Sequence, residues 1–399
     1  MKPAIVLFDL DGVLIGPRGY RAAVAGSVQQ MLDRMGLGAQ PPTALVPALF
    51  ESIGITSEWD MVPVTVAIVL NAVAQHTQQP LPPVSLPEVM DWVRALGIAE
   101  LKIDYESPVR GLNGLVTTRI TPAYALYQIL LAGGLRHILP HLDHQPFVRD
   151  LLEDTRDPAR SLTLRLVQSH VLGERVFRET YGLEPEVQME STLVAMDRPL
   201  LDARIGARLR ELHAAGALRM CAFTARPSLP PRDGGFSPQG YSPEAELALG
   251  LVNFEDIPLM GYGRLITYGK VHGVSPDGIL KPAPLQSLAA VAAAVTGQEW
   301  AALEWARQYL QDIAEGKQPG LAEGMPRGFD LHVFEDASVG IRGGQAAAGL
   351  LRKSGAVVDY HPWGIATIAD KEAALRAAGA PVFADVNQAL RAAFGALVE

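Results

Sequence analysis

The stretch AIVLFDLDGVL at residues 4–14 guides the interpretation of the whole chain. Residues 5–8 are four consecutive large apolar residues, which is typical of a buried strand. The run ends in Asp9 and Asp11, which are separated by one residue and followed by Gly12. If the extended backbone continues, the two acidic side chains point to the same side. Because two adjacent carboxylates repel each other, the sequence predicts a positive group beside them.

The composition indicates a globular protein with a large core. The chain has 399 residues, enough for two or three domains, and 48% of them are hydrophobic. Its 34 basic and 43 acidic residues give a net charge of −9, which argues against nucleic acid or an anionic membrane as a partner. The single cysteine, Cys221, excludes an internal disulfide and a cysteine-rich metal site.

Neither a secretion signal nor a membrane span is expected. The acids at positions 9 and 11 interrupt what would be the apolar part of a signal peptide. Residues 61–74, MVPVTVAIVLNAVA, are the most membrane-like stretch, but they are shorter than the roughly 20 residues that a span needs. They also contain Pro63 and Asn71, so we predict a buried helix and a soluble, cytoplasmic protein.

A long segment after the first strand is predicted to be mostly helical. Few strand-like alternations are found between residues 20 and 190, and loops such as QQPLPPVSLP interrupt the pattern. Helical spacing or composition is found at 20–36, 43–53, 58–76, 123–132 and 161–181. We therefore predict one large helical domain at residues 16–195, inserted after the first strand.

From about residue 198 strands and helices alternate. Strands are predicted at 218–225, 329–336, 356–362 and 381–386, and helices at 200–216, 284–296, 298–315, 338–355, 371–379 and 387–398. Residues 228–270 are rich in proline and glycine and are interpreted as an irregular insert. The alternation predicts parallel βαβ units, so residues 1–15 and 196–399 should form a Rossmann-like α/β core, a parallel sheet flanked by helices.

Polar residues lie where these strands end or where a helix begins. They are Thr224, Lys281, Glu335 and Asp336. Lys281 precedes a helix that Pro282 or Pro284 can open. Because the strand ends of an open parallel sheet converge on one crevice, we expect these residues to meet Asp9 and Asp11 there.

Such a set of residues suits phosphoryl transfer. Clustered carboxylates hold Mg²⁺, and Lys281 offsets their repulsion. Asp9 can attack phosphorus to form an aspartyl-phosphate, and Asp11 can protonate the leaving oxygen and then deprotonate water. Thr224 can donate a hydrogen bond to a phosphoryl oxygen, and Lys281 can neutralise charge in the transition state.

Four segments resemble the motifs of the haloacid dehalogenase superfamily. They are DLDGV at 9–13, the strand-terminal Thr224, KPAP at 281–284 and EDASVGI at 335–341. The resemblance implies that Asp9 is the nucleophile and Asp11 the general acid and base, with Thr224 and Lys281 as phosphate binders. Residues 16–195 lie where that family places its C1 cap.

The resemblance also implies a Mg²⁺ site. Its ligands would be Asp9, Asp336 and the backbone carbonyl of Asp11, with Glu335 binding directly or through water.

The expected function is a Mg²⁺-dependent phosphatase that acts on a small phosphorylated metabolite. A phosphomutase of the same superfamily and a non-catalytic binding protein that keeps the fold are the alternatives. A dehalogenase needs neither the second acid nor a metal, and a phosphonatase needs a cap lysine, for which only Lys102 is available.

Other residues are weaker candidates for the site. Arg226, two residues after Thr224, can contact the phosphate, although a surface arginine on a loop is the simpler interpretation. Lys270 is a rival to Lys281. In the predicted cap, Arg110 and Arg119 are candidates for recognising an anionic substrate. A metal site is suggested by the spacing of three histidines and opposed by the intervening Pro140; they are His137, His141 and His144.

Overall fold

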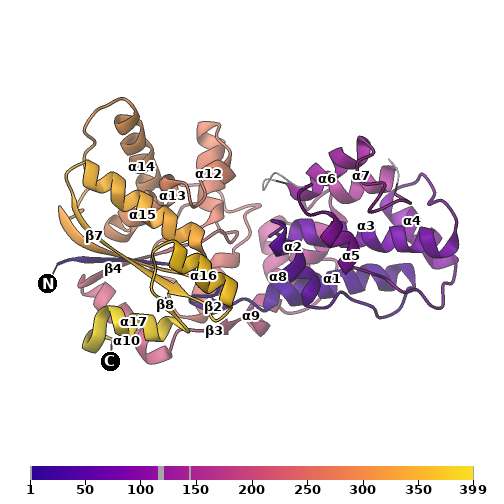
Figure 1. Cartoon of the computed structure of the whole chain (residues 1–399), viewed down its shortest axis with the longest axis horizontal. Helices are drawn as coiled ribbons and strands as arrows, with labels where there is room; N and C mark the ends of the chain where they lie inside the picture. Colours follow the sequence, from indigo (N-terminus) through magenta and orange to yellow (C-terminus); the bar gives the residue numbers. More distant parts are fainter. Residues whose placement is uncertain (1, 116–120, 143–144, 399) are drawn as a thin grey trace. The chain divides into compact units, whose positions relative to one another are not determined.

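The chain divides into two compact units. The computed structural model describes residues 2–115, 121–142 and 145–398. One unit, here called the α/β unit, consists of Met1–Pro17 and Met196–Glu399; the other, the helical unit, consists of Arg18–Ala195 (Figure 1). Each unit has its own core and is described separately.

A six-stranded sheet forms the centre of the α/β unit. Its order is β5-β4-β1-β6-β7-β8, and every neighbouring pair is parallel. The strands are β1 (Ala4–Phe8), β4 (Leu218–Phe223), β5 (Leu259–Met260), β6 (Gly328–Glu335), β7 (Val357–Ile365) and β8 (Val382–Phe383). A separate antiparallel pair joins β2 (Ile15–Gly16) to β3 (Arg198–Pro199). The parallel sheet, its flanking helices and the helical insertion after β1 confirm the predicted fold class.

Helices cover both faces of the sheet (Figure 1). They are α10 (Ala203–Ala214), α11 (Glu244–Leu251), α12 (Tyr262–His272), α13 (Pro284–Thr296), α14 (Glu299–Ala314), α15 (Ser338–Lys353), α16 (Ala369–Ala377) and α17 (Val386–Phe394), with short 3-10 helices at Pro276–Gly278 and Gly395–Leu397. Ile5 and Leu7 of β1 enter the core beneath α13 and α15, whereas Val6 and Phe8 enter the core that includes α10 and α17. Both faces being buried explains why β1 is a continuous apolar run.

Among the described helices of the helical unit, α3 has the largest share of buried residues. The helices are α1 (Gly19–Met35), α2 (Leu45–Ser52), α3 (Glu58–Thr77), α4 (Leu86–Ala95), α5 (Glu106–Gly111), α6 (Pro122–Leu131), α7 (Pro146–Leu152), α8 (Leu162–Tyr181) and α9 (Thr192–Met196). Two buried polar side chains of α3 have partners inside the unit. Asp60 pairs with Arg156 at 2.5 Å, and Asn71 accepts the backbone N–H of His141 at 3.0 Å. The buried helix predicted at residues 61–74 is therefore confirmed.

Among the helices that the structure describes, none combines the length and the apolar composition needed to cross a membrane.

Four helices in the described part of this unit lie outside the predicted ranges, namely α4, α5, α7 and α9. For α4 the sequence did carry a signal. Ser85 and Glu88 form a capping box, and Pro87 occupies the first turn, where its missing N–H is not needed. The prolines that indicated a loop therefore belong partly to a helix start.

The prediction that residues 228–270 are irregular is wrong from residue 244 onward, where α11, β5 and α12 are found. A buried charged network organises this region. Arg264 is 0% exposed and donates from Nε and Nη2 to the carboxylate of Glu299, at 3.0 and 3.1 Å. Its Nη1 donates to the carbonyl of Leu229 at 2.8 Å and pairs with Glu246. These contacts hold the proline-rich loop against α14.

Replacing Arg264 by methionine should lower the free energy of unfolding by about 3–5 kcal/mol, because the fully buried Glu299 carboxylate loses its guanidinium partner. Denaturant titration measures the change. The matched control is Arg307→Met, because Arg307 pairs with Glu304 at 3.2 Å on the surface, where such a pair is worth about 0–1 kcal/mol. Equal losses of stability in Arg264→Met and Arg307→Met would contradict a stabilising role for the buried Arg264 network.

Candidate active site

Two strand ends place acids around one lysine. Asp9 follows β1, and Glu335 is the last residue of β6, the strand that pairs with β1. Lys281 Nζ lies 3.0 Å from Asp9 Oδ2 and 2.5 Å from Glu335 Oε1. All three side chains are buried, with 6% of Asp9, 8% of Lys281 and 0% of Glu335 exposed. A buried ammonium therefore lies between two buried carboxyl groups.

Gln286, in the first turn of α13, positions this lysine. Its Oε1 accepts the backbone N–H of Lys281 at 2.9 Å. Its Nε2 donates to the carbonyls of Thr224 and Met260, at 3.0 and 2.8 Å. Thr224 directly follows β4, and Met260 is the last residue of β5. One buried amide thus joins the lysine loop to two strand ends. Gln286 was not predicted from the sequence, where its only signal is its position as a polar residue in a largely apolar helix.

A third acid, Asp336, joins this cluster. Asp9, Glu335 and Asp336 each offer an oxygen, and these atoms lie within 4.8 Å of one another. Oε2 of Glu335 is buried and has no hydrogen-bond partner among the described residues. The ion pair of Asp336 is with Lys371, in the first turn of α16, at 2.5 Å. Lys371 was not predicted.

Two glycines make room for these acids. A Cβ atom at Gly340, in the first turn of α15, would lie 1.7 Å from Glu335 Oε1. At Gly12 a Cβ would lie 2.5 Å from Asp336 Oδ2, and the φ angle of +74° favours glycine independently. The backbone therefore approaches the carboxylates more closely than any other residue would allow.

The acids outnumber the nearest cation. Burial and the nearby Asp9 raise the pKa of Glu335 well above its ordinary value, against the opposing effect of Lys281. Burial also raises the pKa of Asp336, although Lys371 opposes it. For Lys281, burial alone would lower the pKa, but the carboxylates of Asp9 and Glu335 raise it, so the lysine stays charged. The surplus of negative charge, the oxygen-only donors and the unpartnered oxygen fit a hard divalent cation such as Mg²⁺.

Asp11 has a different partner. The strand ends at Phe8, and the carbonyl of Leu10 accepts the N–H groups of residues 13–15, so the extended backbone assumed from the sequence gives way to a turn. Arg226 donates from Nε and Nη2 to the two oxygens of Asp11, at 2.9 and 2.5 Å. The Asp11 carboxylate is thus held by a guanidinium and does not belong to the three-carboxylate cluster.

The surface-loop interpretation of Arg226 is wrong, because only 3% of this residue is exposed. Asp197, which is almost fully buried, holds Arg226 Nη2 at 3.0 Å. Thr224 is also buried, and its Oγ1 accepts the backbone N–H of Arg226 at 3.2 Å. Asp197 was not predicted, since nothing in the surrounding sequence marks it.

The remaining candidates lie apart from this cluster. Lys270 is exposed at the end of α12, where its Nζ lies 3.3 Å from the hydroxyl of Tyr241. In the helical unit Arg110 pairs with Glu106 on the surface, and Lys102 is exposed. His137 and His141 are exposed in a region of turns. Arg119 and His144 lie outside the described residues.

A second group of potential metal ligands, Asp330, His332 and His361, lies on β6 and β7. The two imidazole rings stack with their centroids 4.7 Å apart and 21° between their planes, so their in-plane lone pairs do not converge on one ion. Trp363 donates to Nδ1 of His332 at 3.1 Å, which leaves the ring proton on Nε2. Burial and His361 lower the pKa of His332 to about 4. This group is better explained as aromatic packing than as a metal site.

Comparison with known proteins shows the fold but not the activity. No family model and no curated protein matches the chain. An X-ray structure of target ZR25 of the Northeast Structural Genomics Consortium is similar over 98% of both chains, with 15% identity and a TM-score of 0.64. Phosphatase Tt82 from Thermococcus thioreducens has 13% identity and a TM-score of 0.39, with 93% of this chain and 99% of that chain covered. Only the first of these scores indicates a shared fold.

Proposed function

We propose that this chain is a Mg²⁺-dependent phosphatase of the haloacid dehalogenase type, acting on a small phosphorylated metabolite. The observation that carries the proposal is the buried lysine between Asp9 and Glu335, with Asp336 beside them, at adjoining strand ends. A structural protein gains little from burying this much like charge at one place. The order of the four motifs along the chain supports the same proposal.

In the proposed reaction Asp9 attacks phosphorus. A bond forms between a carboxylate oxygen and phosphorus, and the bond from phosphorus to the leaving oxygen breaks. Asp11 gives its proton to the leaving oxygen, so the product departs as an alcohol. Asp11 then takes a proton from a water molecule that attacks the aspartyl-phosphate, which releases inorganic phosphate and restores Asp9.

The cationic side chains would stabilise the transferring group. Lys281, held beside Asp9, can neutralise charge on the phosphoryl oxygens, and Thr224 can donate its hydroxyl proton to one of them. Arg226 now pairs with Asp11, and a bound phosphoryl group would compete for the same guanidinium. Such an exchange would free Asp11 to carry the proton that the leaving oxygen needs.

Asp9, Glu335 and Asp336 would hold the Mg²⁺ ion, with the backbone carbonyl of Asp11 as a further ligand. The bound ion would offset the charge of the phosphoryl group and allow an anionic nucleophile to approach it. In the same proposal the helical unit is the C1 cap and carries the residues that select the substrate.

Hydrolysis of an aryl phosphate should require both Mg²⁺ and Lys281. We expect Lys281→Met to lower kcat by about a hundredfold or more, because a buried cation at the phosphoryl group is lost. Lys270→Met is the matched control, because Lys270 is exposed on α12 and should leave the rate unchanged.

Inorganic phosphate should then be released from at least one member of a panel of sugar and other small phosphates. Isomeric products are followed by NMR in the same samples. Isomer formation that is faster than phosphate release would identify a phosphomutase instead. Absence of both reactions, in protein that binds Mg²⁺, would favour a non-catalytic binding protein.

A further inference from the structure

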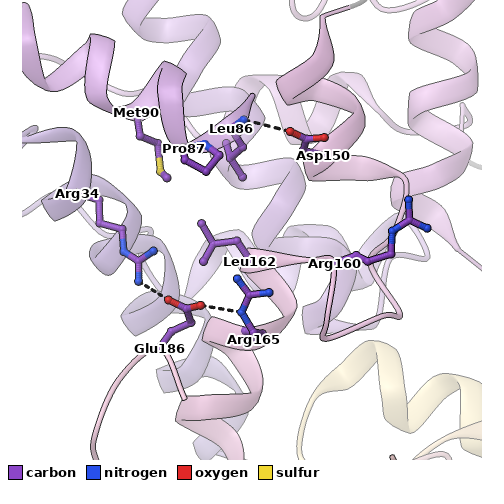
Figure 2. Close-up of a pocket in the computed structure, with 9 residues that line it drawn as sticks. All are labelled: Arg34, Leu86, Pro87, Met90, Asp150, Arg160, Leu162, Arg165 and Glu186. Carbon is purple, nitrogen blue, oxygen red and sulfur yellow. Dashed lines mark hydrogen bonds and ion pairs between the residues drawn. The ribbon is translucent and has the colours of Figure 1, made fainter. Parts of the chain in front are cut away.

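The helical unit contains a pocket of about 310 Å³ between α1, α4 and α8 (Figure 2). Its apolar lining includes Leu86, Met90 and Leu162. Its charged lining consists of three arginines and two acids, namely Arg34, Arg160, Arg165, Asp150 and Glu186. Every lining residue lies in the helical unit, and none belongs to the proposed catalytic set.

Two arginines share one carboxylate in this pocket (Figure 2). Glu186 accepts from Arg34 Nη2 and from Arg165 Nε, both at 2.7 Å. The backbone N–H of Glu186 donates to Ser169 Oγ at 3.0 Å, which fixes the position of the acid. Burial alone would raise the pKa of Glu186, but the two guanidinium groups lower it, so the acid stays ionised. The triad therefore carries one net positive charge in a partly buried place.

A second nitrogen of the Arg165 guanidinium, Nη1, also donates hydrogen bonds, and these restrict the orientation of the group. Nη1 donates to the carbonyls of Pro158 and Ala159, at 3.1 and 3.3 Å. Among the described residues, no acceptor is found for Nη2 of Arg165 or for Nη1 of Arg34. The two arginines thus keep hydrogen-bond donors that the protein itself does not use.

The other charges of the pocket are already balanced. Arg160 pairs with Asp154 at 3.0 Å. Asp150 lies 3.8 Å from Arg149 Nη2. It also accepts the backbone N–H of Leu86 at 3.1 Å, at the start of α4, where the helix dipole favours a negative group. The unbalanced charge therefore belongs to the pair of arginines around Glu186.

We propose that this pocket binds a small organic carboxylate with a hydrocarbon body. The carboxylate would accept hydrogen bonds from Arg34 and Arg165, and the hydrocarbon would lie on Leu86, Met90 and Leu162. A monoanion neutralises the single surplus charge of the triad, whereas a dianionic phosphate would leave a negative charge in a partly buried place. This site is additional to the proposed phosphatase centre.

Benzoate is a suitable probe, and the methyl group of Met90 reports on it locally. In protein labelled with ¹³C at the methionine methyls, the Met90 signal is assigned by its loss in Met90→Leu. We expect benzoate to shift this signal saturably. Benzyl alcohol has no negative charge, and phenyl phosphate is a dianion. We expect each of them to bind about tenfold more weakly than benzoate, or not at all.

Two variants test the contacts. Arg165→Gln should weaken benzoate binding by about tenfold or more, because a charged fork is replaced by a neutral amide. Leu162→Trp should block the pocket with a larger side chain while both arginines remain. If Arg165→Gln loses its helical circular dichroism, binding of benzoate to Leu162→Trp tests the proposal instead. Arg175→Gln is the matched control, because Arg175 lies on the same helix, is exposed and pairs with Glu179.

Three results would each overturn the proposal. The first is a Met90 signal that benzoate does not shift saturably. The second is equal binding of benzoate and benzyl alcohol, or tighter binding of phenyl phosphate. The third is benzoate binding that survives unchanged in Leu162→Trp. None of these measurements depends on phosphatase activity, so the proposed function can fail while this site is retained, and the reverse also holds.

Discussion

Replacing Asp9 by asparagine should reduce turnover by at least about a thousandfold, while the protein remains folded. The amide has nearly the same size as the carboxylate, but it is not a nucleophile toward phosphorus. Because no aspartyl-phosphate can form, both the transfer step and the later hydrolysis are lost. Steady-state phosphate release and single-turnover labelling with a ³²P substrate measure the two steps separately.

The surroundings of Asp9 explain why the fold should tolerate this change. The backbone N–H of Leu10 donates to Asp9 Oδ1 at 2.8 Å, and an asparagine oxygen can accept the same bond. Lys281 keeps Glu335 as its partner. The charge on Asp9 is one cause of the raised pKa of Glu335, so its removal lowers repulsion within the cluster.

The control for this substitution is Asp330→Asn, on β6 but outside the cluster, which should keep full activity. Mass spectrometry must show that the asparagine at position 9 has not deamidated to aspartate. More than about a tenth of the original activity, in protein that passes this check, would contradict a covalent mechanism.

The sequence was informative about the core because the signals there are local. A strand buried on both faces needs consecutive apolar residues, and β1 shows them; the carboxyl ends of parallel strands meet at one edge, so the juxtaposition of Asp9 with Glu335 follows from topology alone. The position of Lys281 was suggested by its place before α13, but its attachment through Gln286 depends on three-dimensional contacts.

Other features could not be predicted from local patterns. Arg226 meets Asp11 across 215 positions of the chain and Asp197 across 29, and such ion pairs leave no periodic trace. The helices between residues 228 and 270 depend on the buried Arg264 and its carboxylates, which outweigh a composition rich in proline and glycine. In both places long-range electrostatics determines structure that short windows of sequence do not encode.

Removal of divalent metal should abolish phosphate release, and Mg²⁺ should restore it. The cluster of Asp9, Glu335 and Asp336 presents oxygen donors with one cationic side chain between them, which suits a small hard cation. Ca²⁺ should restore activity poorly, because it prefers about 6–8 ligands at longer distances than the octahedral Mg²⁺. Activity is measured after dialysis against EDTA and after addition of each metal.

Binding itself provides a readout that does not depend on activity. Mg²⁺ should raise the midpoint of thermal unfolding, because a ligand of the folded state stabilises it. The carboxyl groups of Glu335 and Asp336 have raised pKa values, so a larger fraction of them is protonated as the pH falls. Protons then compete with the metal, and the affinity for Mg²⁺ should decrease toward acidic pH and increase toward neutral pH.

The two strand-end acids should differ in their importance for the metal. Asp336→Ala should weaken Mg²⁺ binding more than Glu335→Ala, because Lys281 already occupies one oxygen of Glu335, whereas Lys371, the partner of Asp336, is half exposed and can turn toward water. Asp330→Ala serves as the control for a carboxylate of the same strand outside the cluster. Calorimetric titration of Mg²⁺ into the three variants gives the order of affinities. Full activity after EDTA treatment, or Mg²⁺ affinity that is unchanged in Asp336→Ala, would exclude a metal role for these acids and leave Lys281 as the main counter-charge of the site.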